Sequence, residues 1–186
     1  MSKRFFKISI FFISIILTQS CSKEETIESN GYVNKNNSIY NLNYGYIENL
    51  RDDNFNFFKI FLSDKPIEFK NGQRLVADDR EVQIDLYFMK PLSQTYEGFY
   101  PLVIEDGTIL NDQLHLTGSA ITFGITPNTT DENISSDFEE RNFIWNNGSA
   151  IITTNNGHFN INFSLENNDY LIEGEFNENL IDVSSN

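Results

Sequence analysis

Few side chains in this chain are of a type that does covalent or acid–base chemistry. The sequence has one cysteine, Cys21, and two histidines, His115 and His158. A nucleophilic serine or cysteine needs a neighbouring base, and no Gly-x-Ser-x-Gly motif marks such a serine. His115 shares the polar face of its predicted strand with Gln113 and Thr117, and His158 follows the Asn156-Gly157 turn, so we expect both to face solvent. As a zinc pair they lack a third ligand at a recognisable spacing.

Glu173 and Glu175 are the carboxylates whose spacing best fits catalysis. They are two residues apart on one predicted strand, which places both side chains on one face with α-carbons about 7 Å apart. Glycosidases use an acid and a base at such separations. However, the polar face of a strand in an acidic protein commonly carries carboxylates, and no cleft is indicated around these two. We therefore expect a non-enzymatic protein with no catalytic residues and no cofactor.

Acidic clusters offer the oxygen ligands that calcium prefers. They comprise Asp52, Asp53 and Asn54, then Asp78, Asp79 and Glu81, and finally the segment from Asp131 to Glu140. None has the Asp-x-Asn-x-Asp-Gly spacing that preforms a calcium loop. We therefore expect solvated loop charges here and no metal site.

The first 20 residues have the order of parts of a signal peptide. Lys3, Arg4 and Lys7 precede the mostly apolar run from Ile8 to Leu17, and small polar residues follow it. A membrane-spanning helix needs roughly 20 apolar residues, and this run is about half as long. We therefore expect residues 1–20 to direct export and to be removed.

Cys21 stands at the expected cleavage point. A secreted chain that used cysteine for disulfides would carry an even number, so a single cysteine indicates another chemistry. The residues Leu17-Thr18-Gln19-Ser20-Cys21 resemble the lipobox of bacterial lipoproteins, with Thr18 where that motif usually has an aliphatic residue. The resemblance implies a diacylglycerol on the Cys21 sulfur, cleavage before Cys21 and acylation of the new amino group. Two or three acyl chains make a stable anchor.

Residues 21–31 form an acidic tether behind this cysteine. Lys23, Glu24 and Glu25 resemble the short signal that sends some Gram-negative lipoproteins to the cell surface. By the same resemblance, Ser22 in place of aspartate argues against retention in the inner membrane. We therefore expect a lipid-anchored protein of the outer membrane that faces outside.

The charge of the mature chain excludes one class of partner. The sequence has 13 basic and 27 acidic residues, and three of the basic residues lie in the signal peptide. The 10 basic residues that remain give the mature chain a net charge of −17. A phosphate backbone needs clustered Lys and Arg, so we expect no binding to nucleic acid.

Alternating hydrophobicity dominates residues 32–186, which we expect to form one antiparallel β-domain. It is clearest near the C-terminus, where Asn155-Asn156-Gly157 and Asn167-Asn168-Asp169 separate three predicted strands of a meander. Gly174, in the last of them, predicts a bulge or a close backbone approach. Further strands are expected over 99–104 and 114–125, the second broken near Gly118. We expect no long helix.

Seven to nine such strands predict a single antiparallel β-sandwich, with a small closed, lipocalin-like barrel as the alternative. The segment "GFYPLV" and the closing meander resemble small β-rich lipoproteins of Gram-negative outer membranes, whose functions are mostly unassigned. That resemblance implies an all-β domain and carries over no active site.

Aromatic residues are the remaining candidates for a site. Tyr40, Tyr44 and Tyr46 share one face of a predicted strand and form a candidate ligand platform. Phe57 and Phe61 oppose Phe58 on the next strand, so that strand is expected to be central or covered on both faces. We expect a binding, adhesion or accessory role toward a surface glycan or an envelope protein. The alternative is a carrier that holds a small apolar ligand inside a barrel.

Overall fold

The computed structural model describes residues 29–51, 56–70, 73–74, 80–103, 113–125 and 145–184. These residues form strands, turns and irregular connections, and they contain no helix. No helix in this described part is long and apolar enough to cross a membrane. The all-β prediction is therefore confirmed.

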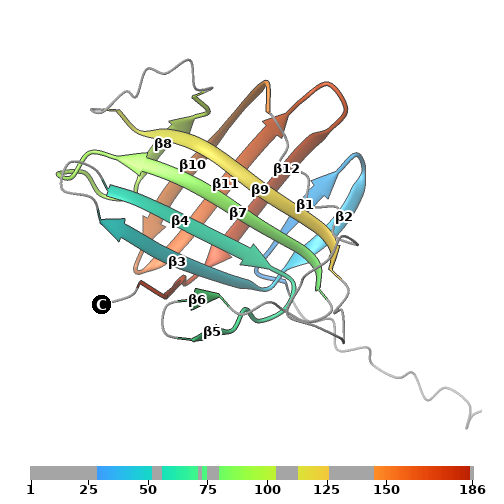
Figure 1. Ribbon diagram of the computed structural model, residues 1–186, viewed down its shortest axis with the longest axis horizontal. Coiled ribbons are helices and arrows are strands. Elements are labelled where there is room, and N and C mark those ends of the chain that lie inside the picture. The colour runs from blue at the N-terminus through green and yellow to red at the C-terminus, as the bar shows by residue number, and fades with distance from the viewer. Residues whose placement is uncertain are drawn as a thin grey trace, which may run out of the picture.

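Two sheets pack face to face, and their strands cross (Figure 1). The six-stranded sheet is antiparallel throughout, in the order β2 (Ser38–Leu42), β1 (Gly31–Lys35), β12 (Leu171–Glu178), β11 (His158–Glu166), β10 (Asn147–Asn155), β8 (Gly98–Pro101). The five-stranded sheet has the order β13 (Ile181–Asp182), β3 (Tyr44–Arg51), β4 (Asn56–Ser63), β7 (Arg80–Lys90), β9 (His115–Ile125). Only β13 pairs in parallel, with β3. The sandwich prediction is confirmed.

The alternative of a closed barrel is wrong. Each sheet ends in two edge strands, β2 and β8 in one and β13 and β9 in the other. A parallel backbone bridge between Leu102 and Leu116 links one edge of each sheet. The two sheets nevertheless do not merge into a single closed sheet. The described strands therefore do not form the barrel interior that the ligand-carrier alternative assumes.

Alternate residues of each strand fill the space between the sheets. On β7 the residues Val82, Ile84, Leu86 and Phe88 are all fully buried, as the alternation of the sequence predicts. Phe58 of β4 stacks on Phe88 with ring centroids 4.8 Å apart. Burial of such side chains contributes about 1.5–3 kcal/mol each.

Tight asparagine turns connect the strands of the six-stranded sheet. Between β10 and β11, Asn156 and Gly157 have φ values of 53° and 91°, so the predicted Asn-Gly hairpin turn is confirmed. Between β1 and β2, Asn36 and Asn37 adopt the same left-handed region, with φ values of 48° and 72°. This second hairpin was not predicted, because its turn lacks a glycine.

One predicted strand is divided between the two sheets. The chain leaves the six-stranded sheet at Leu42 and enters the five-stranded sheet at Tyr44. Asn43 holds the corner, because its backbone N–H donates to Ser63 O at 2.9 Å and its side chain donates to Asp64 O at 3.1 Å. The prediction of a single strand across this point is therefore wrong.

The predicted interruption near Gly118 is a β-bulge. The register between β7 and β9 shifts so that Tyr87 faces Gly118 while Phe88 faces Leu116. Thr117 is the extra residue, and its hydroxyl donates to Tyr87 O at 3.1 Å. β9 therefore continues to Ile125 past the bulge.

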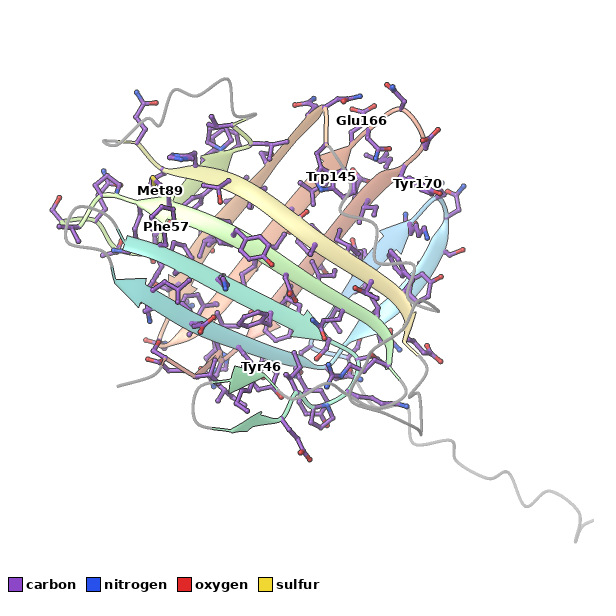
Figure 2. The ribbon with its side chains drawn as sticks, in the orientation of Figure 1. Tyr46, Phe57, Met89, Trp145, Glu166 and Tyr170 are labelled. Atoms are coloured by element: carbon purple, nitrogen blue, oxygen red, sulfur yellow. The ribbon has the colours of Figure 1, made fainter. Side chains whose placement is uncertain are left out.

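The β5–β6 hairpin lies below the five-stranded sheet, beside β3 (Figure 1). It consists of β5 (Phe69–Lys70) and β6 (Gln73–Arg74). Tyr46, Phe61 and Ile67 form a small buried cluster here, and Figure 2 shows Tyr46 between β3 and the hairpin. The Tyr46 hydroxyl accepts a hydrogen bond from Ile67 N at 2.9 Å. β4 lies between β3 and β7, and its outward Phe61 is buried, so the prediction that this strand is central or covered is confirmed.

Gly174 allows the close approach that the sequence predicts. A Cβ atom there would collide with the Phe163 ring and would lie 2.7 Å from Tyr32 O on the neighbouring strand. The register of β12 with both neighbours is continuous at this position, so there is no bulge.

We expect Gly174→Ala to lower the free energy of unfolding by about 1–3 kcal/mol, because backbone and ring must move apart. Gly118→Ala is the matched control, since a Cβ there meets nothing within 4 Å. The control should change stability by less than about 1 kcal/mol. Urea unfolding followed by tryptophan fluorescence measures both. Equal effects of the two substitutions would contradict this account of Gly174.

Candidate functional site

The two outward faces of the sandwich differ in exposure. On the five-stranded sheet, Gln83 and Asp85 point outward but are only 7% and 4% exposed. Arg80 Nη1 donates to Gln83 Oε1 at 2.7 Å, and Gln83 Nε2 donates to Asp85 Oδ1 at 2.8 Å. Buried polar groups need such partners. This part of the face is therefore enclosed, and hydrogen bonds link these three polar side chains to one another.

No element of the described part of the chain covers the outer face of the six-stranded sheet. One row of directly paired residues crosses all six strands, and every member is exposed: Asn41, Tyr32, Glu175, Asn162, Ile151 and Phe99. Neighbouring strands are about 4.8 Å apart, so the row is about 24 Å long. The exposed fractions of Phe99 and Ile151 are 57% and 45%. Large apolar side chains thus stand beside amide and carboxylate groups on one exposed surface.

The charge on this face is negative. Glu166, Glu173 and Glu175 project from β11 and β12, and all three are exposed. Lys35 is the only Lys or Arg within the six strands of this sheet. Its ammonium group lies on the inner side, 4.3 Å from the ring centroid of Phe123. The face therefore disfavours anionic ligands.

A hollow of about 460 Å³ lies at one end of this face. Its lining residues all carry amide, hydroxyl or imidazole groups: Thr153, Asn155, Asn156, His158, Asn160 and Asn177. This volume falls within the range of known small-molecule sites, about 300–1,000 Å³. We call it the amide hollow.

Strand register and the β10–β11 turn bring these residues together. Asn155 pairs with His158 beside the turn, Thr153 pairs with Asn160, and Asn160 pairs with Asn177 of β12. Positive φ at Asn156 and Gly157 keeps the turn tight. The side chains of one face of three adjacent strands therefore meet at the hairpin end.

Two neighbours orient polar groups of the amide hollow. His158 Nδ1 lies 3.2 Å from Glu178 Oε1, a contact that orients the imidazole ring and leaves Nε2 without a partner among the described residues. Asn160 Oδ1 accepts a bond from Asn162 Nδ2 at 2.5 Å, so its own Nδ2 is the group left for a ligand. The side chains of Thr153, Asn155 and Asn177 make no hydrogen bond within the described part of the chain.

Glu97 closes the edge of the sheet next to the amide hollow. Its Oε1 accepts a bond from Thr154 N at 2.9 Å and another from the Thr154 hydroxyl. These hydrogen bonds from Thr154 hold the pKa of the Glu97 carboxyl below its usual range. β8 pairs only with Ser149–Ile152 of β10, so it leaves the backbone N–H of Thr154 without a strand partner. The Glu97 carboxylate accepts a hydrogen bond from this N–H instead.

The predicted tyrosine platform is not formed. Tyr40 belongs to β2, whereas Tyr44 and Tyr46 belong to β3 in the other sheet. Tyr40 packs on Phe123 with ring centroids 4.9 Å apart, and Tyr46 is only 5% exposed. The change of sheet at Asn43 separates them, so the three do not share an exposed surface.

The histidines and the glutamate pair have mixed outcomes. Glu173 and Glu175 share one exposed face, and His158 is exposed, as predicted. His115 is only 4% exposed, so its predicted exposure is wrong. It pairs with Met89 of β7, and its Nδ1 lies 3.1 Å from Gln113 O. His115 is therefore a buried residue of the five-stranded sheet, whereas His158 belongs to the six-stranded sheet.

Several predicted residues lie outside the described part of the chain. They are the lipidation site Cys21, the export signal Lys23, Glu24 and Glu25, and the acidic positions Asp52, Asp53, Asn54, Asp78, Asp79 and 131–140. Within the described residues, no group of three or more His, Cys, Asp or Glu side chains is placed to hold a metal ion.

The spacing of residues in the sequence does not reveal the surface that the strands assemble. Tyr32, Phe99 and Ile151 come from three distant segments, and only strand pairing brings them onto one face. The available signal was the repeated asparagine at alternate positions, as in Asn160 and Asn162 on β11.

Comparisons with known proteins give no match. Neither a protein family, nor a curated protein, nor a solved structure matches the chain. Function is therefore inferred from the chain's own residues.

We expect Glu97→Gln to lower stability slightly at neutral pH and to have no effect in acid. Because the folded-state pKa of Glu97 is lowered, the carboxylate stabilises the fold above its unfolded pKa and loses that contribution as pH falls through the folded value. Urea midpoints of the wild type and variant, measured from about pH 7 to about pH 3, should therefore converge. Thr154→Val removes one donor and should show part of the same effect. A difference that stays constant with pH would contradict it.

Proposed function

We propose that this protein is a non-enzymatic lipoprotein of the Gram-negative outer membrane, and that the uncovered face of its six-stranded sheet binds a partner at the cell surface. The observation that carries the binding role is the exposed row from Asn41 to Phe99. Exposed apolar side chains gathered with polar groups on one face often mark an interaction site.

The anchor and the location are supported by the sequence before the first strand. The segment from Leu17 to Cys21 resembles a lipobox, and Lys23, Glu24 and Glu25 resemble a surface-export signal. β1 begins at Gly31, so nine residues separate it from Cys21. Such a tether spans at most about 30 Å, which keeps the domain close to the membrane surface.

Binding is favoured over catalysis by the setting of the carboxylates. Glu173 and Glu175 are exposed on a flat sheet face. Catalytic carboxylates act in enclosed sites that exclude water and change the pKa of the carboxyl group. The exposed pair supports an electrostatic role, which is to repel anionic ligands from this face.

We expect Cys21→Ala to abolish lipidation and release the protein from the membrane. The domain lies beyond the tether, so its urea midpoint should stay within error of the wild type. Intact-mass analysis of the membrane fraction should show wild-type chains that start at Cys21 and carry acyl mass. Ser22→Ala is the matched control and should remain anchored.

Protease treatment of the same intact cells tests the outer location. Wild-type protein should be cleaved without lysis. An unmodified soluble wild-type chain would overturn the anchor, and an anchored chain that resists protease until lysis would overturn surface exposure.

We expect the double substitution Tyr32→Ala, Phe99→Ala to weaken binding to envelope material at least tenfold, because exposed aromatic anchors carry much of the energy of an interface. The mature lipoprotein in detergent would be immobilised and exposed to fractionated surface polysaccharide and outer-membrane protein. Leu92→Ala is the matched control, since Leu92 is 55% exposed but lies in the β7–β8 connection, off this face. Equal losses, or no binding by the wild type, would contradict the proposed face.

A further inference from the structure

The amide hollow presents hydrogen-bonding groups that the protein itself does not use. The side chains of Asn155 and Asn177 and the hydroxyl of Thr153 have no hydrogen-bond partner within the described residues. Asn160 Nδ2 and His158 Nε2 are left over by the bonds that orient those two side chains. The hollow therefore offers both donors and acceptors, set close together in fixed register.

This mixture of groups matches sugar hydroxyls better than ions. Each hydroxyl of a sugar donates one hydrogen bond and accepts others, and an amide can satisfy both functions. A phosphate or carboxylate ligand would instead need Lys or Arg. Lys35 is the only such residue within the six strands, and it lies on the inner side of the sheet.

An apolar surface adjoins the hollow on the same face. Ile151 is two residues from Thr153 along β10, and Phe99 of β8 pairs with Ile151. The C–H face of a pyranose ring can pack on such side chains while its hydroxyls reach the amides. Glu175 is two residues from Asn177 along β12 and lies on the same exposed face. Its negative charge repels acidic sugars.

The tether leaves the domain beside this hollow. Asn177 N donates to Asn30 O at 2.8 Å, so the residue that precedes β1 lies against a lining residue. With the proposed anchor at Cys21, about 30 Å of extended chain at most separates this side of the domain from the membrane. That anchor would hold the hollow within reach of polysaccharide attached to the same membrane.

We infer that the amide hollow is a binding site for an uncharged saccharide unit of a surface polysaccharide, with Phe99 and Ile151 as the adjoining apolar contact. The inference rests on the proposed function and specifies its ligand class. Asn155, Asn160 and Asn177 bind hydroxyls, and the glutamates of β12 exclude uronic and phosphorylated sugars.

The test is a chemical-shift titration of ¹⁵N-labelled mature lipoprotein in a detergent without a sugar head group. The neutral probes are linear hexasaccharides of glucose, mannose and galactose, and the acidic probe is hexagalacturonate. At least one neutral probe should bind with shifts centred on residues 153–160 and 177. Two hydrogen bonds correspond to about a tenfold change in affinity, so Asn155→Ala with Asn177→Ala should weaken binding about tenfold.

The matched control removes two exposed amides at the opposite end of the β10–β11 hairpin, outside the row and the hollow. Asn146 and Asn168 are exposed and hydrogen-bond to each other, so Asn146→Ala with Asn168→Ala should leave the affinity unchanged. Absence of binding by every neutral probe, preference for the acidic probe, or equal weakening in both double variants would overturn the inference. Proposed surface anchoring and envelope binding would still stand if acyl mass, protease sensitivity and the Tyr32 and Phe99 dependence were found.

Discussion

The stacking of Phe58 on Phe88 fills the space between the sheets at the end of the sandwich where β4 begins and β7 ends. Tyr100 meets both rings edge-on, with centroids 5.9 and 5.0 Å away, and Tyr96 adds a further edge contact at 5.1 Å from Phe58. The Tyr100 hydroxyl donates to Tyr96 O at 2.7 Å, and burial raises its pKa above the ordinary value. One cysteine cannot form a disulfide within the chain, so this packing must hold the crossing sheets together.

Each sheet packs its inner face against the other sheet and keeps an outer face. The two outer faces differ in how much of them is buried. The β5–β6 segment and Val183 cover part of the five-stranded sheet, where Tyr46 and Phe61 are buried. The corners of the sandwich are closed by cations over aromatic rings, with Lys35 beside Phe123 at one end and Lys90 beside Tyr96 at the other. Burial lowers the pKa of Lys90, whose Nζ donates to Gln94 O at 2.6 Å. The described chain thus concentrates its covering elements on one sheet and leaves the other bare.

Local alternation predicted the sandwich because buried and exposed residues alternate along strands such as β12. It could not reveal the corner at Asn43, since Tyr40, Leu42 and Tyr44 keep alternating while the backbone changes sheets. The burial of His115 depends on what surrounds it in three dimensions, which spacing does not report. For the same reason the exposed row could not be predicted. Tyr32 and Phe99 lie on the same face only because four successive strand pairings connect β1 to β8.

The short asparagine side chain suits a site built on a bare sheet. Its amide carries donors and an acceptor but only two rotatable side-chain bonds, so less freedom is lost on binding than with glutamine. Paired strands fix Asn160 and Asn177, and the left-handed turn at Asn156 and Gly157 fixes Asn155. A face arranged in this way is ordered before a ligand arrives, which lowers the entropic cost of binding. The same rigidity comes from the buried aromatic core, because the inward side chains of β10, β11 and β12 alternate with the outward ones along each strand.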